Sequence, residues 1–389
     1  MSETSLDPNR QEQAKIYARI KRKLLLVDLL LGTAYILIWL LTGWSTALRN
    51  FLMTLTTSPW LLVPAFGLVL GGIYFIIDLP LSYYSEYVLP HRFDTSTQTL
   101  KSWIADLLKG LLLSAVLGGI LIEIVYLVLR AAPQTWWLWT GLILLIFNVL
   151  LTNLSPILIM PLFNKFVPLG EENAELVERL TRLAERANAR VRGVYKFDMS
   201  SRTKAANAAL TGMGNTRRII LGDTLLNEFS SDEIETVLAH ELGHHVHKDI
   251  PLLIGFGTLI TILGLYLAAL GLNWGTHLLG LSGPADVAGM PLFAVILGAF
   301  GLITMPLQNG ISRWRERKAD EYALFATGKG DAFASALTRL ANQNLAEADP
   351  DPLVEFFLYS HPALSKRIKM AQNSIQTQPQ VQPQSKQAA

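Results

Sequence analysis

The 389-residue sequence contains no cysteine and few charged residues. Without cysteine the chain can form no disulfide and offers no thiolate to a metal ion, so histidine and carboxylate groups would have to bind any metal. Charged residues make up 16% of the chain, against about a quarter in soluble domains. The formal net charge is +2, which is too small to indicate a nucleic-acid partner.

Hydrophobic residues make up 51% of the chain and are gathered into long apolar runs. Six of these runs are long enough to cross a lipid bilayer as helices. They lie at about 24–43, 60–84, 104–129, 136–160, 252–272 and 291–307. The sequence therefore predicts a mainly α-helical, polytopic membrane protein whose six transmembrane helices form a bundle or chamber. The apolar stretch 47–60 is short, and we expect an interfacial or re-entrant piece, or a reduced seventh span, there.

The connections between the runs differ in charge. The N-terminus, residues 85–103, residues 165–250 and the chain after 310 carry nearly all the Lys and Arg, whereas the other three connections carry only Arg49 and Arg130. Six crossings place the basic set on one side of the membrane, which is the cytoplasmic side by the positive-inside rule.

This pattern divides the chain into five expected parts. Residues 1–163 hold a polar N-terminal segment and four transmembrane helices, 164–250 a cytoplasmic α+β region, and 251–309 two more transmembrane helices. Residues 310–372 form a C-terminal helical part, and the Gln/Pro-rich tail 373–389 is expected to be disordered. Within 164–250 the pattern predicts a helix at 171–189, a strand at 191–199 and a hairpin of 205–210 with 218–221.

A helix is expected to begin near Ser231 and to run to Lys248, because Ser230 and Glu233 have capping-box spacing. On such a helix His240 and His244 lie one turn apart on one face. Two imidazoles so placed can bind one metal ion, and Glu241 beside them can take a proton from a metal-bound water. This is the His-Glu-x-x-His arrangement of zinc peptidases.

A catalytic zinc site needs a third protein ligand. Glu316 and Asp320 are four residues apart, so one carboxylate could bind the metal while the other orients a ligand imidazole. Alternatively Glu316 belongs to an ordinary charged helix that forms i,i+4 pairs with the surrounding basic residues. Glu321 is a competing candidate, one step away from the Asp320 face.

The sequence resembles the type I CAAX prenyl proteases, which are integral-membrane zinc metallopeptidases, with the heat-shock protease HtpX as a more distant relative. The resemblance covers most of the chain. The matching segments are Leu81-Ser-Tyr-Tyr-Ser-Glu-Tyr-Val, His91-Arg-Phe-Asp, Ala205-Ala-Asn207-Ala-Ala-Leu, Arg218-Ile-Ile-Leu-Gly-Asp223, the His240–His244 motif, Ser312-Arg313-x-x-Glu316-x-x-x-Asp320, and Tyr359-Ser-His361-Pro362 with Arg367-Ile368. Eukaryotic members have seven spans and a longer polar insertion, so one early span is missing or reduced here.

The resemblance implies that Glu316 is the third ligand of one Zn²⁺ per chain and that Asp320 supports a ligand histidine. It also implies that His361 and Arg367 line the active site, with His361 near the substrate carbonyl oxygen. An extended substrate could add to the edge of the 205–210 strand, where Asn207 and Ala208 are the expected contacts.

These observations predict a membrane-embedded zinc metalloendopeptidase whose active site faces the cytoplasm. Its expected partners are the lipid bilayer and a peptide or protein substrate, in particular the C-terminus of a prenylated protein. One alternative is an HtpX-like protease that acts on non-prenylated membrane proteins in quality control. A remote alternative is a non-catalytic scaffold or transporter.

Overall fold

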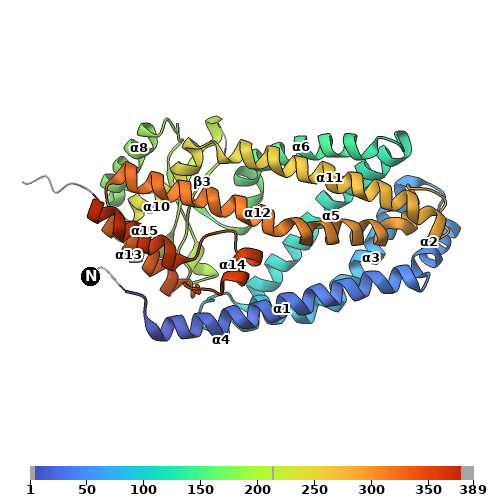
Figure 1. The fold of residues 1–389 in the computed structure, drawn as a ribbon, viewed down its shortest axis with the longest axis horizontal. Coiled ribbons are helices and arrows are strands. Elements are labelled where there is room, and N and C mark those ends of the chain that lie inside the picture. Colours follow the sequence, from blue (N-terminus) through green and yellow to red (C-terminus); the bar gives the residue numbers. More distant parts are fainter. Residues whose placement is uncertain (1–4, 213, 378–389) are drawn as a thin grey trace, which may run out of the picture.

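A computed structural model describes residues 5–212 and 214–377, and most of them are helical (Figure 1). Among these residues, six helical segments are long and apolar enough to cross a membrane, which confirms the six-span prediction. They contain α1 (Pro8–Leu41), α3 (Pro59–Ser82) with α4 (Leu89–Arg92), α5 (Leu100–Ala131), α6 (Trp136–Leu154) with α7 (Met160–Phe163), α11 (Asp249–Leu278) and α12 (Met290–Thr327).

Large apolar side chains cover the outer faces of these segments. Ile303 on α12 is 77% exposed and Leu68 on α3 is 72% exposed. Apolar surface of this extent is stable only against lipid, because water would disfavour it.

The short apolar stretch after the first span forms α2 (Trp44–Leu55). Twelve residues of α-helix are about 18 Å long, well below the roughly 30 Å of a bilayer core, so α2 does not span. It packs against α1 and α3 at the end of the molecule opposite to the sheet (Figure 1). Arg49 on α2 forms an ion pair with the buried Asp286, which fixes α2 to the connection between α11 and α12.

A four-stranded sheet lies at the other end of the molecule. Its strands are β1 (Phe166–Pro168), β2 (Val194–Phe197), β3 (Ala208–Thr211) and β4 (Arg218–Gly222), in the order β1-β2-β4-β3. β3 and β4 form the expected antiparallel pair, with Ala208 opposite Leu221, while β2 and β4 are parallel. β3 is therefore an edge strand of the sheet.

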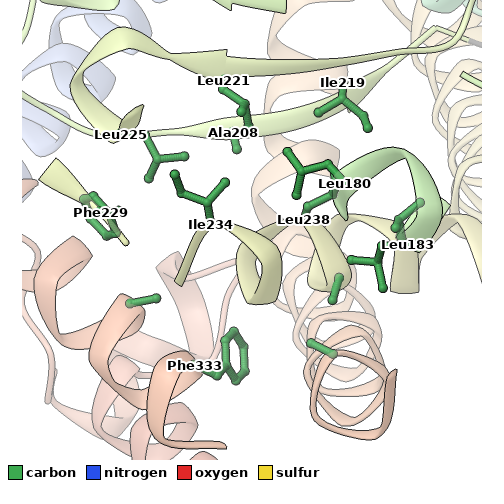
Figure 2. Packing of buried hydrophobic residues seen from close by; sticks show 14 of the residues in the cluster. Leu180, Leu183, Ala208, Ile219, Leu221, Leu225, Phe229, Ile234, Leu238 and Phe333 are labelled. Carbon is green, nitrogen blue, oxygen red and sulfur yellow. The ribbon is translucent and has the colours of Figure 1, made fainter. Parts of the chain in front are cut away.

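One face of the sheet packs on α8 (Ala174–Arg186) and α10 (Ser231–Val246). On the other side of α10, α13 (Gly330–Gln343) packs against it, and α15 (Leu364–Thr377) packs against α13, within the same apolar core. Figure 2 shows Ile219 and Leu221 of β4 facing Leu238 and Ile234 of α10, with Phe333 of α13 below them. Two further short helices are α9 (Asp223–Glu228) and α14 (Pro352–Leu358). The core fixes α10 between the sheet and the C-terminal helices.

Several predicted boundaries are wrong for identifiable reasons. The strand predicted from 205 begins at Ala208, because side chains bind the backbone before it: Thr224 donates to the carbonyl of Ala205, and Asn344 bonds both the N–H and the carbonyl of Ala206. The strand predicted at 191–199 is confined to β2, and the helix predicted at 171–189 has its α-helical part in α8.

Three helices also differ from expectation. α10 ends at Val246 rather than Lys248, because Lys248 adopts a left-handed conformation (φ 56°) from which α11 starts in a new direction. α12 runs without a break across the expected boundary at 309–310, so a single helix connects the membrane to the third ligand candidate. α15 continues to Thr377 into the tail predicted to be disordered, since Ile368 and Ala371 anchor it in the core; residues 378–389 lie outside the described residues.

Candidate active site

The helix α10 begins at a complete capping box. The Ser230 hydroxyl accepts a bond from the Glu233 N–H, and the Glu233 carboxylate accepts one from the Ser230 N–H. Two otherwise unpaired donors of the first turn are thereby satisfied. Ile234, Leu238 and Leu242 on this helix face the core. His240 and His244 are one turn apart on another face, toward α12. Glu241 lies beside β3, near the backbone of Leu210.

Three side chains converge between α10 and α12. One ligand atom from each of His240, His244 and Glu316 lies within 4.8 Å of the other two. The Nε2 atom of His240 lies 3.2 Å from one Glu316 carboxylate oxygen, and the Nε2 atom of His244 lies 3.4 Å from the other. Glu316 and His240 are both buried. The structure thus brings together the three residues expected to bind a metal.

The Nδ1 atom of each imidazole meets a second carboxylate. His240 Nδ1 lies 2.8 Å from Asp320 Oδ1, and Arg367 donates two hydrogen bonds to the same carboxylate, at 2.8 and 2.6 Å. Asp320 therefore contacts one of the two histidines that the sequence predicts as metal ligands. The buried pair of Asp320 and Arg367 orients the ring so that Nε2 faces the centre.

His244 has an equivalent arrangement on the other side. Its Nδ1 atom lies 2.7 Å from Asp249 Oδ2, and Arg315 bonds Asp249 through Nε at 2.5 Å and the His247 carbonyl through Nη2 at 2.9 Å. The sequence reading missed both Asp249 and Arg315. Asp249 lies beyond the break between α10 and α11, where helical spacing no longer indicates which side chains share a face.

The electrostatics of the site favour a cation at its centre. Burial opposes a charge on His240, but its contact with the Asp320 carboxylate and the nearby Glu316 carboxylate outweigh burial and raise its pKa to about 9. For His244 the contacts with Glu316 and Asp249 likewise outweigh burial and raise the pKa. Three carboxylates around two imidazoles thus create a negative potential that positive charge relieves.

Glu241 lies next to the convergence point and faces a cleft. Burial raises the pKa of Glu241, while the nearby imidazoles and the backbone N–H of Leu210 on β3 lower it in part. The net effect makes Glu241 a stronger base than an exposed glutamate. A carboxylate in this position can accept a proton from a water held at the centre.

The cleft has a volume of about 260 Å³ and lies between β3, α10, α13 and α15. Its lining includes the expected substrate contacts Asn207 and Ala208, together with His361 and Arg367. The Nε2 atom of His361 lies 3.3 Å from Glu316 Oε1, and the His361 side chain is 59% exposed. His240 and Glu241 line the same cleft, and His244 and Glu316 lie beside His240 at the convergence point.

Other histidines are engaged elsewhere. His247 Nδ1 lies 2.8 Å from the Gly243 carbonyl, and His91 lies within hydrogen-bond distance of the Tyr87 and Gln98 carbonyls. These contacts occupy ring nitrogens of both histidines away from the convergence point.

Comparison with known proteins gives matches over nearly the whole chain. Residues 170–375 match the family model of peptidase family M48, and residues 2–165 match the model of the CAAX prenyl protease N-terminal region with five membrane helices. The chain belongs to peptidase family M48. It is thus a member of a family of membrane metallopeptidases.

Individual M48 relatives agree with this assignment. CAAX prenyl protease 1 of Saccharomyces cerevisiae is 35% identical over 77% of this chain and 70% of its own length. An uncharacterized metalloprotease of Bacillus subtilis, YhfN, is 29% identical over 94% of this chain and 86% of its own length. The crystal structure of Ste24p from S. mikatae superposes with a TM-score of 0.85 at 28% identity, covering 95% of this chain and 90% of that one.

The M48 N-terminal model is described as having five membrane helices, whereas four of the six candidate spans of this chain lie within residues 2–165. The twelve-residue α2 is the further helix in this region. This M48 chain thus has a helix too short to cross the bilayer beside four that can.

The M48 family implies a metal, and the donor set fits one. Glu316 Oε2 is buried and makes no hydrogen bond with the described residues, although His240 Nε2 lies 3.2 Å away. A buried carboxylate oxygen without such a bond is costly unless a cation meets it. Two imidazole nitrogens and one carboxylate form a set that catalytic zinc uses, with a fourth position open.

Proposed function

We propose that this chain is a zinc metalloendopeptidase of the membrane that hydrolyses peptide bonds with a metal-activated water. One observation supports this most directly: His240, His244 and Glu316 converge at the end of a cleft that Glu241 also faces. A metal there would lie beside both a base and an open sheet edge. That combination is what peptide hydrolysis requires.

Bound zinc would act as a Lewis acid that lowers the pKa of a water and polarises the peptide carbonyl. His240, His244 and Glu316 would hold it. Glu241 accepts the proton of the attacking water and then donates it to the leaving amine. The raised pKa of Glu241 suits both steps, because the carboxylate must bind and release the same proton near neutral pH.

His361 and Arg367 have different roles in this proposal. The exposed ring of His361 beside Glu316 can donate a hydrogen bond to the carbonyl oxygen as negative charge develops on it. The Arg367 guanidinium already donates two bonds to Asp320, with an exposed fraction of only 11% for its side chain. We therefore infer that Arg367 acts mainly by positioning Asp320 and His240.

The edge of β3 offers the substrate an extended docking site. Hydrogen bonds to the backbone of an edge strand hold a peptide without reading its sequence. Ala208 presents its backbone to the cleft, and the exposed Asn207 side chain lies at the start of this edge. We propose these two residues as substrate contacts.

The favoured substrate class is the C-terminus of prenylated proteins. Support comes from the relatives named CAAX prenyl protease 1, one of which matches this chain at 35% identity, and from a site on α12, the helix that leaves the membrane. The alternative is quality-control proteolysis of non-prenylated membrane proteins. A relative named only as a metalloprotease, matched over more of the chain, keeps this alternative open. Cleavage rates of one peptide with and without an S-farnesyl group would distinguish the two.

The chemistry is tested by two substitutions in the purified full chain. Glu241→Gln keeps the side-chain volume but removes the base, so we expect one zinc per chain and a loss of peptide cleavage of at least about a thousandfold, the upper part of the range for base catalysis.

Glu316→Ala removes a ligand, so we expect zinc to be lost on dialysis. Metal analysis and cleavage assays provide the readouts. Cleavage by Glu241→Gln at the wild-type rate would refute the mechanism, and a full zinc content in Glu316→Ala would refute the ligand set.

A further inference from the structure

Asn344 replaces a strand partner at the cleft edge of β3. It follows the last residue of α13, and its own N–H is fixed to the Leu340 carbonyl at 3.0 Å. Its side-chain oxygen accepts from the Ala206 N–H at 2.8 Å, and its side-chain nitrogen donates to the Ala206 carbonyl at 3.1 Å. One amide side chain thus forms both hydrogen bonds that a residue of a neighbouring strand would form.

The direction in which each residue of β3 faces follows from its pairing with β4. The Gly222 N–H donates to the Asn207 carbonyl, and Ala209 lies opposite Ile220. In an antiparallel pair, alternate residues direct their backbone groups to the partner strand. Asn207 and Ala209 therefore face β4, while Ala206, Ala208 and Leu210 face the cleft. The N–H and the carbonyl of Ala206 are already bonded to the Asn344 side chain.

The catalytic centre lies toward the opposite end of this edge. The backbone N–H of Leu210 interacts with the Glu241 carboxylate. Leu210 is four residues beyond Ala206, which is about 13 Å along a strand. A peptide cleaved beside Glu241 therefore has space for about three further residues along β3 before it meets Asn344.

We propose that Asn344 determines where a bound substrate strand ends. Antiparallel pairing is the commoner arrangement, and it places the C-terminal side of the substrate toward Ala206. Asn344 then limits the number of residues that remain paired after the cleaved bond. A longer segment must leave the line of β3 at Asn344 and bend out of the cleft. This inference rests on the proposed peptidase function and on the β3 edge as docking site.

The test measures how the cleavage rate depends on the length of the substrate beyond the cleaved bond. The peptides keep the N-terminal half of whichever parent peptide, farnesylated or unmodified, is cleaved faster, and carry from one residue to about eight after the bond. Mass spectrometry fixes the cleavage position, and kcat/KM is measured for each length. For the wild type we expect kcat/KM to stay constant up to about three residues after the bond and then to decrease about tenfold, since a segment that bends away at Asn344 gives up about two strand hydrogen bonds.

Asn344→Ala removes the amide and should reduce that decrease to about twofold or less, with longer peptides gaining most. Gln343→Ala is the matched control: Gln343 is adjacent to Asn344 but bonds the Lys204 carbonyl at 2.8 Å, farther from the centre. It should keep the wild-type length profile. A structural role of Asn344 alone would lower the rate for all lengths equally and leave the profile unchanged.

The outcomes distinguish a failure of the inference about Asn344 from a failure of the proposed peptidase function. A wild-type rate that is independent of length overturns the inference, whether or not Asn344→Ala folds, and so does a variant profile equal to that of the wild type. A second peptide series varies the length before the cleaved bond instead; a decrease in that series alone would show a parallel substrate and overturn the assigned direction. If the zinc-loaded wild type cleaves none of the peptides in a Glu241-dependent manner, the proposed function itself fails.

Discussion

At the scale of single residues, the two imidazoles proposed to bind the metal, those of His240 and His244, are held by equivalent contacts. Each Nδ1 atom meets a buried carboxylate, and an arginine binds each carboxylate: Arg367 with Asp320, and Arg315 with Asp249. The hydrogen bond at Nδ1 fixes the tautomer that leaves Nε2 free for the metal. At Asp320, burial raises the carboxyl pKa, but the Arg367 charge and the contact with His240 outweigh it and leave the pKa below its usual value.

Asp249→Asn tests this role for His244. The amide keeps the size of the side chain but weakens the contacts with His244 and Arg315, so we expect the zinc affinity to fall about 10–100-fold. Competition with a chromophoric chelator measures this affinity independently of activity. Asp286→Asn is a matched control, since Asp286 is also buried and paired with an arginine, but at the opposite end of the molecule. It should lower the melting temperature and leave zinc affinity unchanged; equal affinity in all three proteins would exclude the role given to Asp249.

The site was predictable from the sequence to the extent that its signals are local. His240 and His244 are four residues apart on one helix, and that spacing alone places them together. Glu316 lies on another helix, and the residues alone did not distinguish it from an ordinary member of a charged helix; the family resemblance was needed. Asp249 could not be found, because Lys248 turns the chain between α10 and α11 and so breaks the periodicity.

At the scale of helices, the separation of α10 and α12 determines the geometry of the metal site. They pack closely at Gly243, which lies between the two histidines in the sequence. A Cβ atom at Gly243 would lie 2.8 Å from the Cα of Ala319 and 3.0 Å from its carbonyl oxygen. Both are backbone atoms, so no rotamer change can relieve the contact. Glycine is therefore required for α12 to bring Glu316 to both imidazoles.

Gly243→Ala should push the two helices apart. We expect destabilisation of about 1–3 kcal/mol, the usual range for overpacking, and a zinc affinity at least about tenfold lower, because the ligand from α12 moves away from the other two. Thermal melting and chelator competition would measure the two effects. Gly298→Ala on α12 is the control, since a Cβ at Gly298 meets nothing within 4 Å. Wild-type zinc affinity in Gly243→Ala would contradict this account.

Ionic contacts also join the starts of α10 and α13 to α8. Arg179 of α8 and Lys329 at the start of α13 both pair with Asp232 and Glu235 on α10. Burial raises the pKa of Glu235, but the hydrogen bonds from Lys329 and Arg179 outweigh it and leave the pKa below its usual value. The same two cations lower the pKa of Asp232. The network thus stabilises the fold at pH values above the ordinary carboxyl pKa, and this contribution is lost as pH falls through the lowered folded-state value.

Glu235→Gln should therefore melt below the wild type at pH 7, by about 1–3 °C for a partly exposed network. The difference should shrink as pH falls below about 4, where the wild-type carboxylate is protonated as well. Melting of both proteins in detergent with chelator removes the contribution of the metal. Glu178→Gln breaks an exposed pair, with 69% of the Glu178 side chain exposed, and should give no difference at any pH. If the melting temperatures of Glu235→Gln and the wild type differ by the same amount at every pH, the ionic explanation is ruled out.

The elements were predictable where hydrophobic periodicity was strong. The six long apolar runs and the amphipathic α8 follow directly from it. The start of β3 does not follow from periodicity. The residues before it are bound by the side chains of Thr224 and Asn344, which are distant from β3 in the sequence. The extension of α15 was missed for a similar reason: burial of Ile368 and Ala371 against the core stabilises a helix whose end looks disordered by composition.

At the scale of the whole molecule, the chain has two distinct ends. The sheet, α10, α13 and α15 form the end that carries the candidate active site, and α2 lies at the other end (Figure 1). The connections at the first end hold nearly all the Lys and Arg, whereas Arg49 and Arg130 are the only ones in the connections at the second. We propose from this asymmetry that the active-site end faces the cytoplasm.

The absence of cysteine allows a direct test of this orientation, because a single introduced thiol is the only one in the chain. Gln134→Cys places it in the exposed connection between α5 and α6, and Glu178→Cys places it on the exposed face of α8. In intact cells a membrane-impermeant maleimide should label Gln134→Cys but not Glu178→Cys. After lysis both should react equally, which controls for accessibility of the thiol itself. The reverse pattern would place the metal site outside the cell, and a substrate with a cytoplasmic C-terminus would then be excluded.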